Sequence, residues 1–409
     1  MIEKTLAIVL AGGSGPRLHP LTDQRTKSAL PFGGKYRLID FTLSNCLHSG
    51  LRKVLVLTQY KSHSLQKHLR DGWSIFMPEL GEYITGVPPQ MRAGDSWYTS
   101  IPNAIFQNRH LLERSGSNLA VILYGEHIYR MDYAAMIDFH RDRNAAATFA
   151  CIEPDGRNFS RFGLVAAESD NRIRQILRHS DVDSARTTDY LHTMGIYVVG
   201  MKPLLDCLDR HQNDVKFTGD FGLDLLANLI PEYPIFAYRF GKSSGRVSVD
   251  KFWRDLDTLD GFYNSNMELL DQYTPIHIYQ EDWPIRTYSG QYPPARTIPG
   301  ISGSEGLFLN SIAAGGVLIA GGGVQHSILF PRVFLDDQSI VENSILFENV
   351  RVGKKARIRN CIIDKNVIVP DKENIGYDER KDRQRFAISD NGIVIVPRDY
   401  RFEKSAVHD

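Results

Sequence analysis

The sequence is poor in cysteine, and the few cysteines it has are scattered. Its 409 residues include four, at Cys46, Cys151, Cys207 and Cys361. Such spacing fits neither a zinc site, whose ligands come in close pairs, nor a framework of disulfides. We therefore expect a protein of the reducing cytoplasm.

An excess of charge of one sign is also missing. Lysine and arginine together number 48, as do aspartate and glutamate, so the formal net charge is +0. This balance implies no nucleic-acid partner and no attraction to a membrane surface. The longest weakly charged stretch, residues 306–331, is rich in polar residues and glycine and is not expected to span a membrane. Glu3 and Lys4 lead directly into an apolar segment, from which we expect no signal peptide.

The length and composition suit a globular protein of two domains, with 42% hydrophobic and 23% charged residues. Residues 6–18 read LAIVLAGGSGPRL, an apolar run followed by glycines and a cation. This pattern is typical of a buried strand that ends in a phosphate-binding loop. The loop matches neither G-x-x-x-x-G-K-[ST] nor G-x-G-x-x-G, so a plain tight turn after an edge strand is an equal alternative.

Apolar, β-rich runs alternate with helical or loop segments through the first two thirds of the chain. The expected strands are residues 6–11, 53–59, 119–124, 147–152 and 195–199. Strands that alternate with helices predict a mostly parallel sheet covered on both faces, with ligands at the carboxyl ends of the strands. The glycine loop and Glu126 each follow one of these strands, so we expect them on the same edge of the sheet.

A repeat occupies the C-terminal third. The triplets SIL, SIL and CII begin at Ser327, Ser344 and Cys361, spaced by seventeen residues. Short apolar segments about six residues apart, three to a coil, are typical of a parallel β-helix of hexapeptide type. An antiparallel β-sandwich with accidental periodicity is the less favoured alternative.

The boundaries follow from shifts in composition. We expect an α/β domain over residues 1–273, a connector rich in Tyr, Pro, Trp and Arg over 274–300, and the β-helix domain over 301–409. The charged run 378–383 is expected to be a solvated loop, followed by a short strand at 393–396.

Several long strings make the sequence similar to a known family. They are LAGGSGPRLHPLT (10–22), PFGGKYRLIDFTLSNCLHSGL (31–51), LTQYKSHSLQKH (57–68), HIYRMDY (127–133), MGIYV (194–198), DFGLDL (220–225), FWRDLDTLD (252–260) and WPIRTY (283–288). Over nearly its full length the chain resembles bacterial ADP-glucose pyrophosphorylase, or glucose-1-phosphate adenylyltransferase. The resemblance implies a Rossmann-like nucleotidyltransferase domain followed by a left-handed parallel β-helix.

The resemblance also implies a reaction. The family converts ATP and glucose 1-phosphate into ADP-glucose and pyrophosphate, the committed step of bacterial glycogen synthesis. By resemblance, Arg17 and Lys27 would clamp ATP phosphates, and Glu126 and Asp255 would bind Mg²⁺, with Mn²⁺ as a substitute. The implied nucleotide-binding residues are Leu10, Ala11, Gly12, Gly13, Gly15, Gln90 and Gly125. The implied sugar-phosphate residues are Tyr98, Gly163, Arg178, His179 and Thr193.

Regulation and assembly are implied in the same way. The family binds allosteric metabolites, and Lys27, Gln59, Trp97 and Tyr98 match positions connected with activation. Core packing is an equal alternative for Trp97 and Tyr98. Arg357 and Arg359 are weaker candidates that we expect to be solvated. The family implies a homotetramer, and a damaged active site would suggest a heterotetramer with a catalytically complete paralogue.

The chain departs from the family's motifs at positions of the chemistry. Pro16 replaces threonine in the loop, Glu126 replaces the metal-binding aspartate, and residues 100–104 lose a glycine, a hydroxyl and a carboxylate. The Glu-Lys-Pro string that grips the sugar and its phosphate becomes Arg178, His179 and Ser180. Two further departures are Leu223 in place of lysine and Asp257 in place of glycine.

Three interpretations follow. Misplacement by about one ångström can cost a hundredfold in rate, so we favour a chain that keeps its fold, has lost most of its catalysis and serves as a regulatory subunit. The substitutions are alternatively compensated, and the enzyme works normally. A third interpretation is an active nucleotidyltransferase with a changed sugar substrate.

Overall fold

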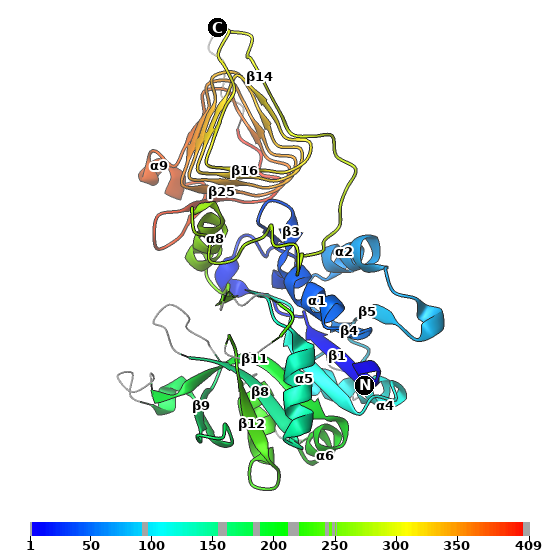
Figure 1. The fold of residues 1–409 in the computed structure, drawn as a ribbon. Coiled ribbons are helices and arrows are strands. Elements are labelled where there is room, and N and C mark those ends of the chain that lie inside the picture. The colour runs from blue at the N-terminus through cyan, green and yellow to red at the C-terminus, as the bar shows by residue number, and fades with distance from the viewer. Residues whose placement is uncertain are drawn as a thin grey trace. The chain divides into compact units, whose positions relative to one another are not determined.

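The computed structural model describes residues 2–91, 97–153, 162–182, 189–211, 221–241, 245–247, 250 and 252–403. The chain forms two compact units (Figure 1). The sheet unit consists of Met1–Ser14, Leu38–Asp255 and Tyr279–Arg286, and the β-helix unit consists of Gly15–Arg37, Leu256–Ile278 and Thr287–Asp409. The domain boundaries at residues 273 and 300 stay a prediction.

The sheet unit is built around β1 (Thr5–Leu10), whose six residues are all buried. Strands β4 (Lys53–Leu57) and β6 (Leu119–Tyr124) flank it in parallel, and β5 (Tyr83–Val87) extends the sheet in parallel beyond β4. Apolar side chains on both faces of β1 and β6 require cover on both sides, which is why these runs are continuous rather than alternating. The mostly parallel sheet expected from the sequence is confirmed.

The other half of the sheet contains antiparallel pairs that the strand–helix alternation did not predict. Strand β11 (Leu191–Gly200) runs antiparallel to both β6 and β8 (Ala147–Ile152). The remaining strands are β9 (Leu164–Ala167) and β10 (Ile173–Leu177), which pair antiparallel, and β12 (Ile235–Arg239), which pairs in parallel with β8. Two strands lie outside this sheet and pair antiparallel, β7 (His127–Tyr129) and β13 (Trp253–Asp255).

Helices connect these strands. They are α1 (Leu38–His48), α2 (His63–Trp73), α3 (Ile101–Gln107), α4 (Arg109–Arg114), α5 (Tyr133–Asp142), α6 (Met201–His211) and α7 (Phe221–Asp224), with 3-10 turns η1 (Ile2–Lys4), η4 (Pro78–Leu80), η5 (His179–Asp181) and η7 (Leu226–Leu229). Asp132 caps α5 by accepting a hydrogen bond from the backbone of Ala134. Such caps satisfy amide groups that the helix leaves unpaired at its start.

Part of the predicted connector packs on α1 within the sheet unit. Trp283 is 2% exposed, and its indole N–H donates to the Asn45 side chain over 2.9 Å. The backbone N–H of Arg286 donates to the Ser44 hydroxyl over 2.8 Å. Trp283 is therefore buried, whereas Tyr279 and Tyr288 of the same segment are 71% and 45% exposed.

The β-helix unit confirms the seventeen-residue repeat. Ile328 pairs in parallel with Ile345, and Ile345 with Ile362 (Figure 1 shows the coils stacked as triangles). Each of the three faces of the β-helix is one sheet. The first face consists of β14 (Arg296–Ile298), β17 (Leu318–Ala320), β20 (Phe334–Leu335), β23 (Arg351–Val352) and β26 (Ile368–Val369), and the second of β15 (Leu307–Leu309), β18 (Gly323–Gln325), β21 (Ile340–Glu342), β24 (Arg357–Arg359) and β27 (Asn374–Ile375). The third face consists of β16 (Ile312–Ala313), β19 (Ile328–Leu329), β22 (Ile345–Leu346), β25 (Cys361–Ile363), β29 (Val394–Val396) and β28 (Ala387–Ile388).

The first residue of each triplet forms a ladder inside the coils. The Ser327 hydroxyl accepts the backbone N–H of Ser344 over 3.1 Å, and the Ser344 hydroxyl accepts that of Cys361 over 3.2 Å. These side chains are fully buried, so the ladder pairs polar groups that would otherwise be unsatisfied. The small residue at this point of the repeat is thereby explained.

The corners of the coils also repeat. Residues with a left-handed backbone conformation recur every seventeen residues at three corners. One corner has Asn343 and Asn360, the second has Arg332, Asn349 and Asn366, and the third has Gln338, Lys355 and Lys372. Asparagine tolerates this conformation better than most residues, which suits it to two of the three corners.

The β-helix unit also contains helices and short strands that are not part of its coils. Helix α8 (Leu259–Met267), followed by η8 (Glu268–Leu270), packs on the coils, with the Tyr263 hydroxyl donating to the Asn343 carbonyl over 2.6 Å. The segment Gly15–Arg37 contributes η2 (Pro16–Leu18), η3 (Lys27–Ala29) and the paired strands β2 (Pro31–Phe32) and β3 (Tyr36–Arg37).

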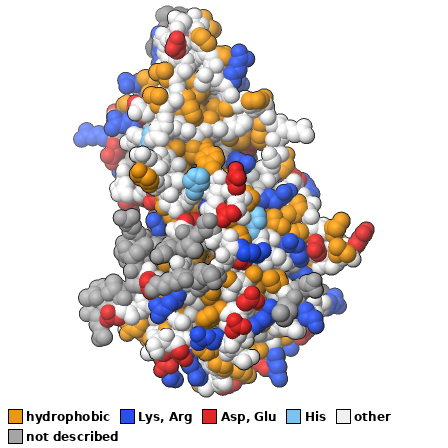
Figure 2. All heavy atoms as spheres, in the orientation of Figure 1, with side chains coloured by type: hydrophobic (Ala, Val, Ile, Leu, Met, Phe, Trp, Pro, Cys, Tyr) orange, Lys and Arg blue, Asp and Glu red, His pale blue; other side chains and the backbone are white. Residues whose placement is uncertain are grey.

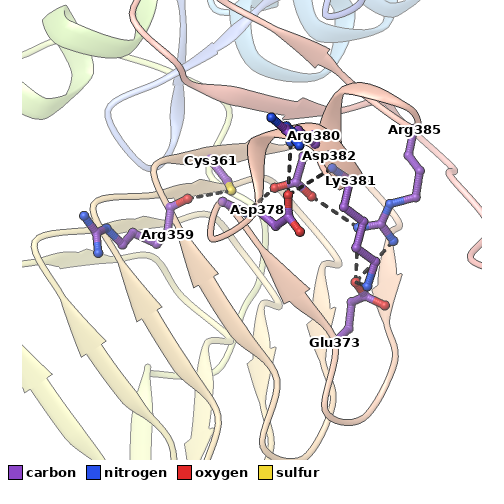
Figure 3. Close-up of polar contacts among 9 residues, drawn as sticks. Arg359, Cys361, Glu373, Asp378, Arg380, Lys381, Asp382 and Arg385 are labelled. Atoms are coloured by element: carbon purple, nitrogen blue, oxygen red, sulfur yellow. Dashed lines mark hydrogen bonds and ion pairs between the residues drawn. The ribbon is translucent and has the colours of Figure 1, made fainter.

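The charged run 378–383 is solvated as expected, with all but Asp382 exposed, but it forms a short helix and not a loop, so that part of the expectation is wrong. Asp378 accepts hydrogen bonds from the backbone of Arg380 and Lys381 and so caps α9 (Glu379–Arg383) (Figure 3). Asp382 is 1% exposed and accepts from Arg385 and from the backbone of Gly376. The run folds because two of its carboxylates bind backbone amides. The strand expected after it is present as β29.

The distribution of charged side chains and of cysteines agrees with what the sequence predicts. Lysine and arginine side chains are interspersed with aspartate and glutamate over the visible face (Figure 2). All four cysteines are buried as free thiols, and burial raises the pKa of Cys207 to about 11. No helix within the described part of the chain is both long and apolar enough to cross a bilayer.

Candidate active site

Two carboxylates that the sequence assigned to a metal lie together in the sheet unit. Glu126 follows β6, and Asp255 ends β13, which pairs with β7 so that Asp255 is opposite His127. One ligand atom from each of these three residues lies within 4.8 Å of the others. The strand pairing therefore connects residues more than a hundred positions apart in the sequence.

Burial makes this cluster suitable for a cation. Glu126 is 6% exposed, the Asp255 side chain 5% and His127 not at all. Carboxylate oxygens are the ligands that Mg²⁺ and Mn²⁺ prefer, and adjacent buried carboxylates repel each other unless a positive charge lies between them. The donor set fits the divalent cation implied by the resemblance.

His127 is the residue of this cluster that the sequence did not single out. Its Nε2 lies 3.8 Å from Asp255 Oδ1, and its ring stacks on Tyr124 and meets Trp253 edge-on. These aromatic contacts fix the orientation of the imidazole. Its position directly after Glu126, at the carboxyl end of a strand, was the available signal.

The first part of the glycine loop lies against this cluster. A Cβ atom on Gly13 would be 3.4 Å from Glu126 Oε2, and one on Gly125 would be 3.1 Å from Val9. The Gly125 N–H donates to the Leu10 carbonyl over 3.0 Å, and the Ala11 N–H donates to Leu57 over 2.9 Å. A side chain at position 13 would therefore begin in van der Waals contact with the Glu126 carboxylate.

The second part of the loop belongs to the β-helix unit. Gly15 has a left-handed φ of 56°, and the hydroxyl of Thr22 donates to its carbonyl over 3.0 Å. Pro16 opens η2, a position where a missing N–H costs no helical hydrogen bond. The proline that stands for the family's threonine is thus accommodated without loss of local structure.

Two predicted phosphate clamps share one carboxylate in this unit. Arg17 forms an ion pair with Asp257, and Lys27 Nζ lies 3.3 Å from Asp257 Oδ1. Lys27 is 1% exposed, whereas the side chain of Arg17 is 62% exposed.

Four of the five predicted sugar-phosphate residues lie around β9 and β11 of the sheet unit. The Thr193 N–H donates to the Gly163 carbonyl over 3.0 Å, and His179 Nε2 lies 3.0 Å from the carbonyl oxygen of Phe162. His192, which the sequence did not single out, faces His179 with ring centroids 5.4 Å apart. The fourth residue, Arg178, is adjacent to His179 in the chain.

Arg178 is engaged by a neighbouring carboxylate. Its guanidinium lies 3.5 Å from Asp224 Oδ1, and the Asp224 side chain is 2% exposed. Leu223 lies beside Gly163, where a Cβ atom would be 3.1 Å from a Leu223 methyl group. Arg178 and Leu223 thus lie near Asp224 and Gly163, respectively, within the same unit.

Tyr98, the fifth sugar-phosphate candidate, pairs with the predicted regulatory residue Gln59. Gln59 accepts the backbone N–H of Tyr98 over 3.0 Å and donates to its carbonyl over 3.2 Å. Burial raises the pKa of Tyr98, against a smaller opposing effect of its hydrogen bond with Asn108. Trp97 is 57% exposed, which contradicts core packing for that residue, and Gln90 is exposed.

Known proteins resemble this chain over nearly its full length. A family model described as nucleotidyl transferase matches residues 6–272, and one described as GlmU-like C-terminal hexapeptide matches residues 293–396. The chain is 53% identical to glucose-1-phosphate adenylyltransferase 2 of Vibrio vulnificus over 98% of its length and 100% of the relative's. It is 50% identical to the protein of the same name in Vibrio cholerae (98% and 99% covered) and 38% identical to glucose-1-phosphate adenylyltransferase of Methylococcus capsulatus (98% and 94%).

The chain belongs to the glucose-1-phosphate adenylyltransferase family. Its second domain is the left-handed β-helix expected for that family. Of the departures from the family's motifs, Glu126 lies near Asp255, Leu223 near Gly163, and Asp257 near Arg17 and Lys27, so each of these three is close to another candidate site residue.

Proposed function

We propose that the chain binds ATP and glucose 1-phosphate and forms ADP-glucose with a turnover well below that of its relatives, serving in a regulatory role. Low turnover is supported by the contacts of two predicted sugar-phosphate residues. Arg178 is paired with Asp224 and His179 is hydrogen-bonded to a backbone carbonyl, so neither supplies the mobile cation that the family's lysine provides.

The reaction requires that the two substrates are held in position and that the negative charge on their phosphates is neutralised. A phosphate oxygen of glucose 1-phosphate attacks the α-phosphorus of ATP in line, the bond to the bridging oxygen breaks, and pyrophosphate leaves. The backbone of Leu10–Gly13 would cradle the nucleotide, and Arg17 and Lys27 would neutralise charge on the triphosphate. Glu126 and Asp255 would hold Mg²⁺, which supplies charge neutralisation at the phosphates.

The metal assignment gives a testable prediction. Asp255→Asn and Glu126→Gln are each expected to weaken Mn²⁺ binding at least about tenfold, because each removes a charged ligand. Free Mn²⁺ is measured by electron paramagnetic resonance during titration. Asp138→Asn, an exposed change on α5, is the matched control and should leave Mn²⁺ affinity unaltered. Equal affinity in all four proteins would exclude this metal site.

A second candidate function is a fully active adenylyltransferase, or one that uses another sugar 1-phosphate. It is favoured by the proximity of Glu126 and Asp255, which keeps both metal carboxylates despite the longer side chain at 126. The identity to relatives that carry the enzyme's name favours it also.

The proposed regulatory role concerns assembly and effectors. The double hydrogen bond between Gln59 and Tyr98 supports a link between a predicted regulatory residue and a predicted substrate residue. A catalytically complete paralogue would be the partner of this chain in a heterotetramer. A homotetramer is the alternative.

The experiment combines binding and product formation. The purified chain is titrated with ATP and with glucose 1-phosphate in a calorimeter, and ADP-glucose is assayed with Mg²⁺ and with Mn²⁺. Binding of both substrates with little product supports the first function. Turnover at an ordinary rate, near about 10 per second, supports the second. Absence of ATP binding contradicts both.

A further inference from the structure

Asp257 lies among the candidate site residues at a position where the family's motif has glycine. It occupies the short segment between β13 and α8, one residue before the Thr258 cap of that helix. Its carboxylate contacts two cations of the same unit, Arg17 through one oxygen and Lys27 through the other. These are the two side chains expected to clamp the triphosphate of ATP.

Burial makes the contact with Lys27 important. The Lys27 ammonium is almost fully buried, and an ammonium removed from water requires a nearby negative charge or strong hydrogen bonds. Asp257 supplies such a charge 3.3 Å away, and its own side chain is only 16% exposed.

We propose that Asp257 is an internal anion that competes with the phosphates of a nucleoside triphosphate for Arg17 and Lys27. The inference rests on the proposed function, because it takes these cations to be the triphosphate clamp. A phosphate that approaches Lys27 must displace the carboxylate or lie beside it, and like charges at such distances repel. Asp257 thereby sets the affinity for polyphosphate ligands and accounts for part of the low turnover.

A purely supporting role for Asp257 predicts the opposite effect. If the carboxylate only held Arg17 and Lys27 in position for the phosphates, removing it would disorder the clamp and weaken binding. If it competes, removing it frees two cations and strengthens binding. The sign of the change in affinity therefore separates the two roles.

The test measures affinity without metal, so that the site at Glu126 does not contribute. The natural chain, Asp257→Asn and the matched control Asp271→Asn, an exposed acid of the same unit, are titrated calorimetrically with ATP and with inorganic tripolyphosphate. We expect Asp257→Asn to bind both ligands at least about tenfold more tightly, since charge-assisted contacts to two cations become available. Asp271→Asn should bind as the natural chain does.

A second comparison connects the gain to the clamp itself. In an Arg17→Ala background, Asp257→Asn should gain less affinity than it does in the natural background, because one of the two freed cations is absent. A gain of equal size in both backgrounds would contradict competition for Arg17. If Asp257→Asn does not fold, Asp257→Ser is a smaller neutral replacement on which the same titrations are made.

The outcomes separate this inference from the proposed function. If the natural chain binds ATP and Asp257→Asn binds it equally or more weakly, the internal-anion role is wrong while nucleotide binding stands. If neither the natural chain nor the variant binds ATP or tripolyphosphate, the nucleotide site of the proposed function fails, and the inference fails with it.

Discussion

Restoring the family's residues at four positions is expected to raise ADP-glucose synthesis by at least about a hundredfold, the order of effect of misplacing substrate groups by one ångström. The variant carries Glu126→Asp, Arg178→Glu, His179→Lys and Leu223→Lys. It returns a shorter metal carboxylate and two lysines to the site. Turnover is measured with Mg²⁺ at saturating ATP and glucose 1-phosphate.

The Leu223→Lys change is required by the contacts of Arg178. In the natural chain Arg178 pairs with the buried Asp224, so a glutamate at 178 would place two carboxylates together. A lysine at 223, next in sequence to Asp224, supplies the missing positive charge. The matched control is the triple variant without Leu223→Lys, which should gain less activity and be less stable. A folded quadruple variant that binds ATP but shows no gain would mean that catalysis is limited elsewhere.

Breaking the buried ion pair of the β-helix unit is expected to cost about 3–5 kcal/mol in the free energy of unfolding. Arg25 and Asp364 pair with side chains only 2% and 1% exposed. Asp364→Asn leaves the Arg25 guanidinium buried without its carboxylate, 5.9 Å from the ring of Phe347. The neighbouring Lys365 adds positive charge and pairs with Glu348 over 2.8 Å. Unfolding in urea, followed by circular dichroism, measures the loss.

The control for this prediction removes both charges. Arg25→Met with Asp364→Leu should unfold with a smaller loss than Asp364→Asn alone, because no uncompensated charge remains in the core. Glu379→Gln, which breaks the exposed pair with Arg383 on α9, should change stability little. A loss from Asp364→Asn no larger than that from Glu379→Gln would show that the pair does not stabilise the fold.

Much of the fold was predictable because its signals are local or periodic. Strands β1, β6 and β8 coincide with apolar runs, and the triplets at Ser327, Ser344 and Cys361 stack in the register that their spacing predicts. Antiparallel β11 was not predictable, since an apolar run carries no information on direction. Helix α9 was missed because its stability depends on Asp378 and Asp382 binding backbone amides, not on an apolar face.

The candidate site, like the fold, could be predicted from the sequence only in part. Glu126 and Asp255 came from motif matches, and their proximity depends on the pairing of β7 with β13, which no local pattern encodes. His127 and His192 were missed because a single histidine in a strand is most often a core residue. The contacts of Arg178 with Asp224 and of Asp257 with Arg17 join residues that are distant in the sequence, so no motif match could have given them.

The most direct test of a retained fold with weakened catalysis is a side-by-side measurement of kcat. This chain and the Methylococcus capsulatus relative that is 38% identical to it are assayed for ADP-glucose synthesis with Mg²⁺ at saturating substrates. We predict a kcat for this chain at least about a hundredfold below the relative's, with ATP binding retained. A kcat within about tenfold of the relative's, equivalent to 1.4 kcal/mol in the barrier, would contradict weakened catalysis and establish the substitutions as compensated.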